Sequence, residues 1–214
     1  LVFFAILLTD KGLNNAIAGV IPAQKADVKK LAQAGLLAAL CYIGFAFFKI
    51  DIPVGPEKTA FHLGNVFCVL AALLLGGYWG GLAGAIGMTI GDLFDPVYVI
   101  YAPKTFILKL CIGLITGFVA HRLGHIDESS DQGHVLRFAA AGAVCGLVFN
   151  MIFDPLFGYY YKLLILGKPA AELALVWNVA STSINAVLSA IASLVIYMPL
   201  RRALIRSGLV DKLK

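Results

Sequence analysis

Six apolar segments, separated by short polar breaks, run through most of this sequence. They occupy residues 31–49, 60–76, 78–95, 99–121, 136–158 and 171–199. A helix needs about 20 apolar residues to cross a hydrocarbon core about 30 Å thick, and most of these segments are close to that length. The chain has 60% hydrophobic and 14% charged residues, too little polar surface for an ordinary soluble domain. The sequence therefore predicts an all-α integral membrane protein with about six transmembrane helices.

A glycine-rich stretch, residues 76–81, divides the second and third segments. It reads Gly-Gly-Tyr-Trp-Gly-Gly and is either a turn or a kink inside one helix. A single helix over 60–95 is too long for the bilayer, so we expect a turn. The third segment carries glycines on several faces, which predicts close packing against neighbouring helices. These glycines are Gly80, Gly84, Gly87 and Gly91.

Basic residues are unevenly divided between the two ends of the predicted helices. With a cytoplasmic N-terminus, the inner side holds Lys25, Lys29, Lys30, Arg122, Arg137, Arg201, Arg202, Arg206, Lys212 and Lys214. The outer side then holds Lys49, Lys58, Lys104, Lys162 and Lys168. The positive-inside rule therefore places both termini in the cytoplasm. We expect a lead-in over 1–30 with an interfacial position as one option, a six-helix membrane domain over 31–206, and a cytoplasmic tail over 207–214.

Several classes of function find no support in the sequence. The net charge is +5, but no long Lys/Arg run is present, so we expect no nucleic-acid partner. No zinc-protease, serine-hydrolase or nucleotide-binding motif occurs, so we expect no catalytic residue and no cofactor. Asp92-x-x-Asp95 lacks further oxygen ligands nearby, so we expect no metal site.

Three aspartates at membrane depth require an explanation, because buried carboxylates are costly there. They are Asp92, Asp95 and Asp154, and the last two lie in a near-repeat, Phe94-Asp95-Pro96-Val97-Tyr98 and Phe153-Asp154-Pro155-Leu156-Phe157. Asp-Pro pairs are typical of helix ends, which explains the repeat without a function. The same aspartates are also candidates to line a binding pocket that opens to the outside of the membrane.

Further polar residues fall at the outer ends of the predicted helices. They are His62, Asn65, Tyr98, Tyr101, Lys104 and Asn150. Tyrosine is common at membrane interfaces, so the set indicates a site more than any single member does. The last helix adds a polar stripe of Trp177, Asn178, Ser181, Thr182 and Asn185. Such a stripe faces the bundle and bonds either a neighbouring helix or a solute. Together with the three aspartates these residues, Thr182 apart, form the candidate substrate-binding set.

Ala34 and Ala38 lie one turn apart on the first helix and create a face with little side-chain bulk. Small residues at this spacing allow close approach of another helix. The partner is either a helix of the same chain or a second membrane subunit.

Several stretches, taken in order, resemble the S components of energy-coupling-factor (ECF) transporters. They are His62-Leu63-Gly64-Asn65, residues 75–87, Asp92, Tyr101-Ala102-Pro103-Lys104-Thr105 and Gly113-Leu114-Ile115-Thr116-Gly117. The resemblance covers residues 28–206 and is to the riboflavin-transporter-like branch, which also holds proteins assigned to pyridoxine, hydroxymethylpyrimidine and cobalamin.

The resemblance implies a vitamin-binding subunit that docks, through Ala34 and Ala38, on a transmembrane T subunit carrying two cytoplasmic ATPases. It leaves the vitamin open among these candidates. The alternatives are a self-sufficient secondary transporter, which more often shows inverted repeats with broken helices, and a membrane-embedded enzyme.

Overall fold

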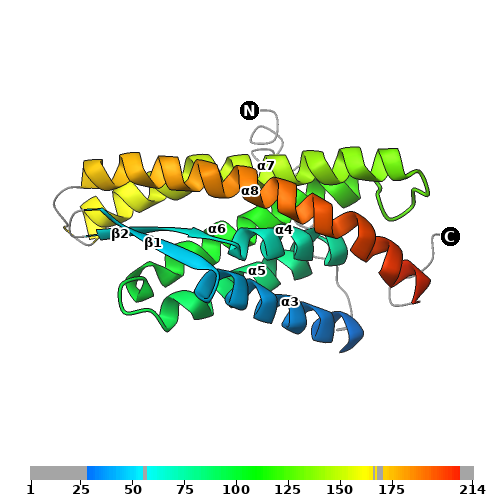
Figure 1. The fold of residues 1–214 in the computed structure, drawn as a ribbon, viewed down its shortest axis with the longest axis horizontal. Helices are drawn as coiled ribbons and strands as arrows, with labels where there is room; N and C mark the ends of the chain where they lie inside the picture. Colours follow the sequence, from blue (N-terminus) through cyan, green and yellow to red (C-terminus); the bar gives the residue numbers. More distant parts are fainter. Residues whose placement is uncertain (1–27, 55–56, 166, 168–170, 208–214) are drawn as a thin grey trace, which may run out of the picture.

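The computed structural model describes residues 28–54, 57–165, 167 and 171–207, and these form six long or medium helices with one hairpin (Figure 1). The helices are α3 (Val28–Ala46), α4 (Gly64–Leu75), α5 (Gly77–Leu93), α6 (Ala102–Gly117), α7 (Gln132–Tyr160) and α8 (Ala171–Arg206). Short helical turns precede α6 (η1, Val99–Tyr101), follow it (η2, Phe118–Leu123) and follow α7 (η3, Tyr161–Ile165). Nearly all of the predicted lead-in and tail lies outside the described residues.

Successive helices run in opposite directions along the long axis of the molecule (Figure 1). The start of α3, the loop before α7 and the end of α8 lie at one end of the bundle, on the right in Figure 1. The hairpin tip and the connection between α5 and α6 lie at the other end. An even number of helices thus returns the chain to the side on which α3 begins.

Four stretches are long and apolar enough to cross a membrane by length and composition: Val28–Ala46, Val99–Leu123, Gln132–Leu164 and Leu175–Arg206. The helix α4 has 12 residues, which corresponds to roughly 18 Å at 1.5 Å per residue. It is short because the chain enters the bundle as a strand before this helix begins. The expected number of helices is therefore found, but only four of them have spanning length.

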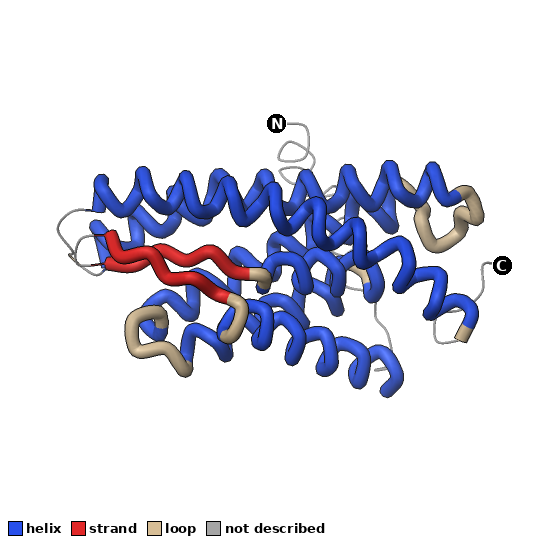
Figure 2. The backbone as a smooth tube through the Cα atoms, in the orientation of Figure 1, coloured by secondary structure: helices blue, strands red, loops and turns tan. Residues whose placement is uncertain are grey.

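A two-stranded antiparallel hairpin, β1 (Lys49–Val54) and β2 (Glu57–His62), follows α3 (Figure 2). Its register pairs Lys49 with His62. Residues 60–62 were expected in a helix and the protein was expected to be all-α, and the hairpin shows that both expectations are wrong in this segment. The pattern of Lys49 and Asp51 alternating with Ile50 and Ile52 has the period of two that is typical of a strand.

The predicted turn between α4 and α5 is confirmed at Gly76. Its φ angle of 83° lies in the left-handed region, which glycine adopts without steric cost. The predicted close packing of α5 is also confirmed. A Cβ atom on Gly80 would overlap the backbone of Ala72 on α4, and one on Gly87 would overlap the carbonyl oxygen of Ala38 on α3.

A second glycine contact joins α5 to α6. A Cβ atom on Gly113 would overlap the backbone of Gly81, and one on Gly117 would overlap the backbone of Gly77. Each helix thus presents a glycine pair at a spacing of four to the other, and the two backbones meet directly. This contact fixes the position of α6, the helix that carries Lys104 and Lys109.

The loop before α7, residues 124–131, is tied to the bundle at the end opposite the hairpin tip. Arg201 on α8 donates a hydrogen bond of 2.8 Å to the carbonyl oxygen of Ile126. Asp131 accepts hydrogen bonds from the backbone N–H groups of Gly133 and His134, which caps the N-terminus of α7. The apolar core lies between this loop and the polar half of the bundle, and includes Leu70, Ile112, Val135 and Leu147.

Candidate ligand-binding site

A pocket lies between β2 and the helices α5, α6, α7 and α8. It contains about 700 Å³ of space not filled by protein atoms, part of it open to the surroundings. Nine of the predicted substrate-binding residues line it: His62, Asp92, Tyr98, Tyr101, Lys104, Asp154, Asn178, Ser181 and Asn185. The fold thus brings together residues separated by more than one hundred positions in the sequence.

Four predicted residues do not line this pocket. Asn65 is buried at the start of α4, and Trp177 is 45% exposed on α8. Asn150 is buried and accepts a hydrogen bond from Lys109, so it helps to position a lysine that lines the pocket. Asp95 lies at the edge of the pocket and pairs with Lys49.

The pocket also contains residues that the sequence analysis did not select. They are Phe45, Thr59, Ala60, Met88, Thr105, Lys109, Lys162 and Thr182. Thr59 and Ala60 belong to the hairpin, which was not predicted. Lys109 interrupts an apolar helix, and a lysine at membrane depth is a recognised sign of a functional site. The sequence alone therefore contains a signal for Lys109.

Charged side chains cross the pocket between α6 and α7. The Nζ atom of Lys104 lies 2.5 Å from an Oδ1 oxygen of Asp154. Five residues further along α6, Lys109 is 5% exposed and its Nζ atom donates a hydrogen bond of 3.0 Å to Oδ1 of Asn150. Burying such groups is favourable only when they are paired, and these pairs fix the separation of the two helices.

The ring of Tyr101 lies close to two ammonium groups. The Nζ atoms of Lys104 and Lys162 are 5.9 Å and 5.5 Å from its centroid. Both distances are within the range in which a cation is attracted to the face of an aromatic ring. Tyr101 therefore helps to hold two positive charges at one side of the pocket.

Two buried polar atoms in the lining lack a hydrogen-bond partner among the described residues. They are Oδ2 of Asp92, whose residue is 1% exposed, and Nδ1 of His62. Buried polar groups in folded proteins are nearly always hydrogen-bonded to protein or water. These two atoms are therefore available to a molecule in the pocket.

The polar stripe on α8 is divided between two roles. Ser181 lies 2.7 Å from the hydroxyl of Thr59 on β2. Asn185 accepts a hydrogen bond of 3.1 Å from the backbone N–H of His62. These two residues bind the hairpin, whereas Asn178 faces the pocket near Gly158.

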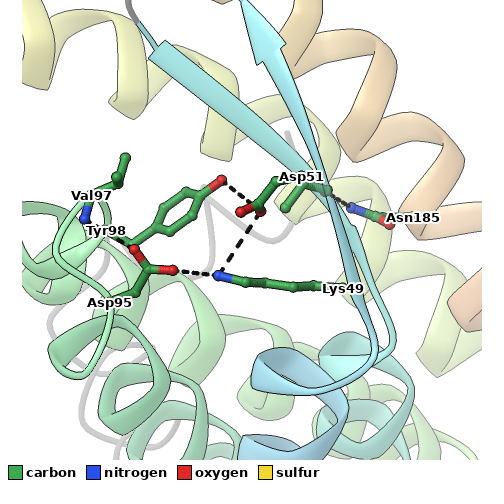
Figure 3. Close-up of polar contacts among 7 residues, drawn as sticks. Lys49, Asp51, Asp95, Val97, Tyr98 and Asn185 are labelled. Atoms are coloured by element: carbon green, nitrogen blue, oxygen red, sulfur yellow. Dashed lines mark hydrogen bonds and ion pairs between the residues drawn. The ribbon is translucent and has the colours of Figure 1, made fainter.

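An ion pair connects the hairpin to the loop after α5 at the edge of the pocket (Figure 3). The Nζ atom of Lys49 lies 2.5 Å from Oδ2 of Asp95 and 4.7 Å from the ring centroid of Tyr98. Partial burial alone would raise the pKa of Asp95. The hydrogen bonds from Lys49 and from the backbone N–H of Val97 outweigh burial and hold this pKa below its ordinary value.

The two alanines proposed for docking lie on the inner side of α3. Ala34 is 7% exposed and packs with Ala71 and Ala83, while Ala38 is half-buried in the same cluster. The spacing of the two alanines is compatible with a helix of the same chain or with a second membrane subunit as the partner. These contacts favour a helix of the same chain.

Comparison with known proteins agrees with this description. A family model described as "ECF-type riboflavin transporter, S component" matches residues 25–202. A crystal structure of the S component for biotin from an ECF-type ABC transporter has a similar fold, with a TM-score of 0.57 and 21% sequence identity over 84% of this chain and 95% of that one. A search of curated proteins gives no match. The chain therefore belongs to the family of ECF-type riboflavin transporter S components, multi-pass membrane proteins that bind the substrate of a vitamin transporter and are not enzymes.

Proposed function

We propose that this chain captures a small water-soluble vitamin or vitamin precursor from outside the cell. The chain delivers it through a transmembrane T subunit that is coupled to two cytoplasmic ATPases. The observation that carries the proposal is the pocket, in which nine polar or charged side chains selected from the sequence converge. The chain itself has no nucleotide-binding motif, so energy for transport comes from the partner subunits.

The position of the pocket along the bundle supports uptake from the outside. Arg201, Arg202 and Arg206 lie at the end of α8, opposite the hairpin tip (Figure 1). An excess of basic residues is typical of the cytoplasmic side, which supports a pocket that opens toward the outside. The apolar core between the pocket and the cytoplasmic end separates the ligand from the cytoplasm while the subunit is alone.

Among the candidate vitamins, the pocket favours the smaller ones. Tyr98 and Tyr101 offer ring faces suited to a single flat heteroaromatic ring, as in pyridoxine-type and pyrimidine-type compounds. Cobalamin needs a wider cavity with fewer charged groups than this one. We therefore rank pyridoxine-type and pyrimidine-type ligands above cobalamin.

Uptake assays in cells test this function. The chain is expressed with the T subunit and ATPases, without them, or with ATPases whose Walker lysine is replaced. Accumulation of a radiolabelled vitamin is expected only with the intact partners. Accumulation by the chain alone in liposomes, driven by an ion gradient, would instead establish a secondary transporter.

A further inference from the structure

A buried carboxylate, that of Asp92, lies in the last turn of α5 and lines the pocket. The residue is 1% exposed, and its oxygen Oδ2 has no hydrogen-bond partner among the described residues. Thr105 on α6 interacts with the carboxyl group but leaves Oδ2 unpaired. Folded proteins rarely leave a buried polar atom in this state, so Oδ2 is placed to bind a molecule that enters the pocket.

The local structure around Asp92 gives no reason for a carboxylate at this position. A helix carries partial negative charge at its C-terminus, so an acidic side chain in the last turn of α5 is unfavourable. Burial adds a second cost, because a buried charge needs hydrogen-bonding partners. Lys104 and Lys109 attract the carboxylate electrostatically. The hydrogen bonds described for their Nζ atoms, however, go to Asp154 and Asn150. The position of Asp92 therefore indicates a role in binding.

Resting on the proposed function, we infer that Asp92 determines ligand specificity by accepting a hydrogen bond from an N–H or O–H group of the ligand. An ionised carboxylate accepts hydrogen bonds and cannot donate them. The ligand class is therefore a vitamin or precursor whose ring carries an amino, hydroxyl or hydroxymethyl group at the point that faces Asp92. A compound of similar shape without this donor leaves the buried carboxylate unpaired, which costs more than the loss of an exposed hydrogen bond.

The second unpartnered atom in the pocket lining, Nδ1 of His62 on β2, does not make the same selection. A ring nitrogen of histidine donates or accepts according to the tautomer and protonation of the ring. Nδ1 of His62 can therefore adapt to either kind of ligand group. Oδ2 of Asp92 has no such freedom, so we assign the discrimination between ligands to Asp92.

Compounds that differ by one donor group test this inference. Binding to the detergent-purified full chain is measured by calorimetry for pyridoxine and for 4-amino-5-hydroxymethyl-2-methylpyrimidine. Analogues of each parent that lack one hydroxyl or amino group are measured in parallel. In the series that binds, loss of one particular donor is expected to weaken binding by about tenfold to a hundredfold, because the carboxylate of Asp92 is left unpaired.

A thermodynamic cycle assigns that donor to Asp92. In Asp92→Leu, the affinity ratio between the parent and the analogue that lacks the donor is expected to fall toward one. Asp92→Asn keeps the shape of the side chain and serves if the leucine variant does not fold. Its ratio is expected to be intermediate, because the amide oxygen is a neutral acceptor. Asp127→Asn is the matched control, since it makes the same chemical change in the loop at the opposite end of the bundle and should leave the ratio unchanged.

The melting temperature of the ligand-free protein separates ligand recognition from a structural role. Asp92→Leu is expected to raise it, because the substitution removes a buried charge near the C-terminus of a helix. A structural residue behaves in the opposite way. A lower melting temperature, together with equal weakening of the parent and the analogue, would overturn the inference.

The failure of this inference can be told from the failure of the proposed function. If every analogue binds as tightly as its parent, the ligand makes no hydrogen bond to Asp92, and the inference is overturned while vitamin binding stands. A compound that co-purifies with the protein and is identified by mass spectrometry replaces the parent in the same cycle; one without any N–H or O–H group also overturns the inference. If no compound co-purifies and neither parent binds, both proposals fail.

Discussion

The side-chain nitrogen of Asn185 on α8 donates a hydrogen bond of 2.9 Å to the backbone carbonyl oxygen of Ala60 on β2. The oxygen of the same amide accepts from the N–H of His62, so a single side chain satisfies two backbone groups of the strand. The hairpin is thereby held along the helix that also carries Asn178. Because β2 contributes Thr59, Ala60 and His62 to the pocket wall, the amide of Asn185 determines the shape of that wall.

Replacement of Asn185 by alanine is predicted to weaken ligand binding by several-fold to tens-fold and to loosen the hairpin. The change removes two hydrogen bonds, each with a net contribution of about 0.5–1.5 kcal/mol. Hydrogen–deuterium exchange at residues 57–62 is expected to increase. Asn178→Ala is the matched control, because it removes an amide from the pocket without touching β2. It is expected to weaken binding while exchange in the hairpin stays unchanged; increased exchange in both variants would contradict the distinction.

The helices and most of the pocket could be predicted from the sequence because their signals are local. Apolar segments separated by polar breaks identify the helices, and polar residues inside them identify groups that must face protein or water. The role of each polar residue could not be predicted in the same way. Asn178 and Asn185 have the same side chain on the same helix, but only the position of β2, distant in sequence, makes one of them an anchor.

The hairpin itself was missed because its signal is short and lies between two strong helical ones. The alternation over residues 49–54 falls almost entirely in the break between the predicted segments 31–49 and 60–76, and residues 60–62 of β2 fall in the second of these segments. Lys109 was missed for a different reason. Its neighbours are apolar, so the hydropathy of the segment predicts a membrane helix whether or not Lys109 is present.

Replacement of Gly113 by alanine is predicted to destabilise the protein by about 1–3 kcal/mol. The added methyl group would overlap the backbone of Gly81, and overpacking of this kind forces helices apart. Gly35→Ala is the matched control, because a Cβ atom at Gly35 has no heavy atom within 4 Å. Both changes bring the same gain in helix propensity, so their difference in melting temperature reports the packing alone. Equal melting temperatures would show that the contact between α5 and α6 tolerates the methyl group.

The ion pair between Lys49 and Asp95 is predicted to lose its stabilising effect in acid. The pKa of Asp95 is lowered in the folded protein, so its contribution is fully present above the unfolded value of about 4. It is lost as the pH falls through the lower, folded value. The difference in melting temperature between the unmodified protein and Asp95→Asn is therefore expected to shrink as the pH is lowered from 7 to 3. A difference that stays constant over this range would show that the carboxylate charge does not stabilise the fold.

The last prediction concerns the outer face of α3, where Ala32, Gly35 and Ala39 are exposed and lie three and four residues apart. Their spacing puts them on one side of the helix, away from the buried Ala34. In the proposed complex, these small side chains would let a T-subunit helix approach closely. Ala39→Trp is therefore expected to abolish co-purification with the T subunit and uptake, without changing calorimetric affinity for the ligand. The control Val187→Trp adds the same bulk to an exposed position of α8 and should preserve uptake. Ala34→Trp should instead impair folding, because Ala34 is buried. If that variant binds the ligand normally but loses uptake, the docking surface contains Ala34 and the assignment to Ala32, Gly35 and Ala39 is wrong.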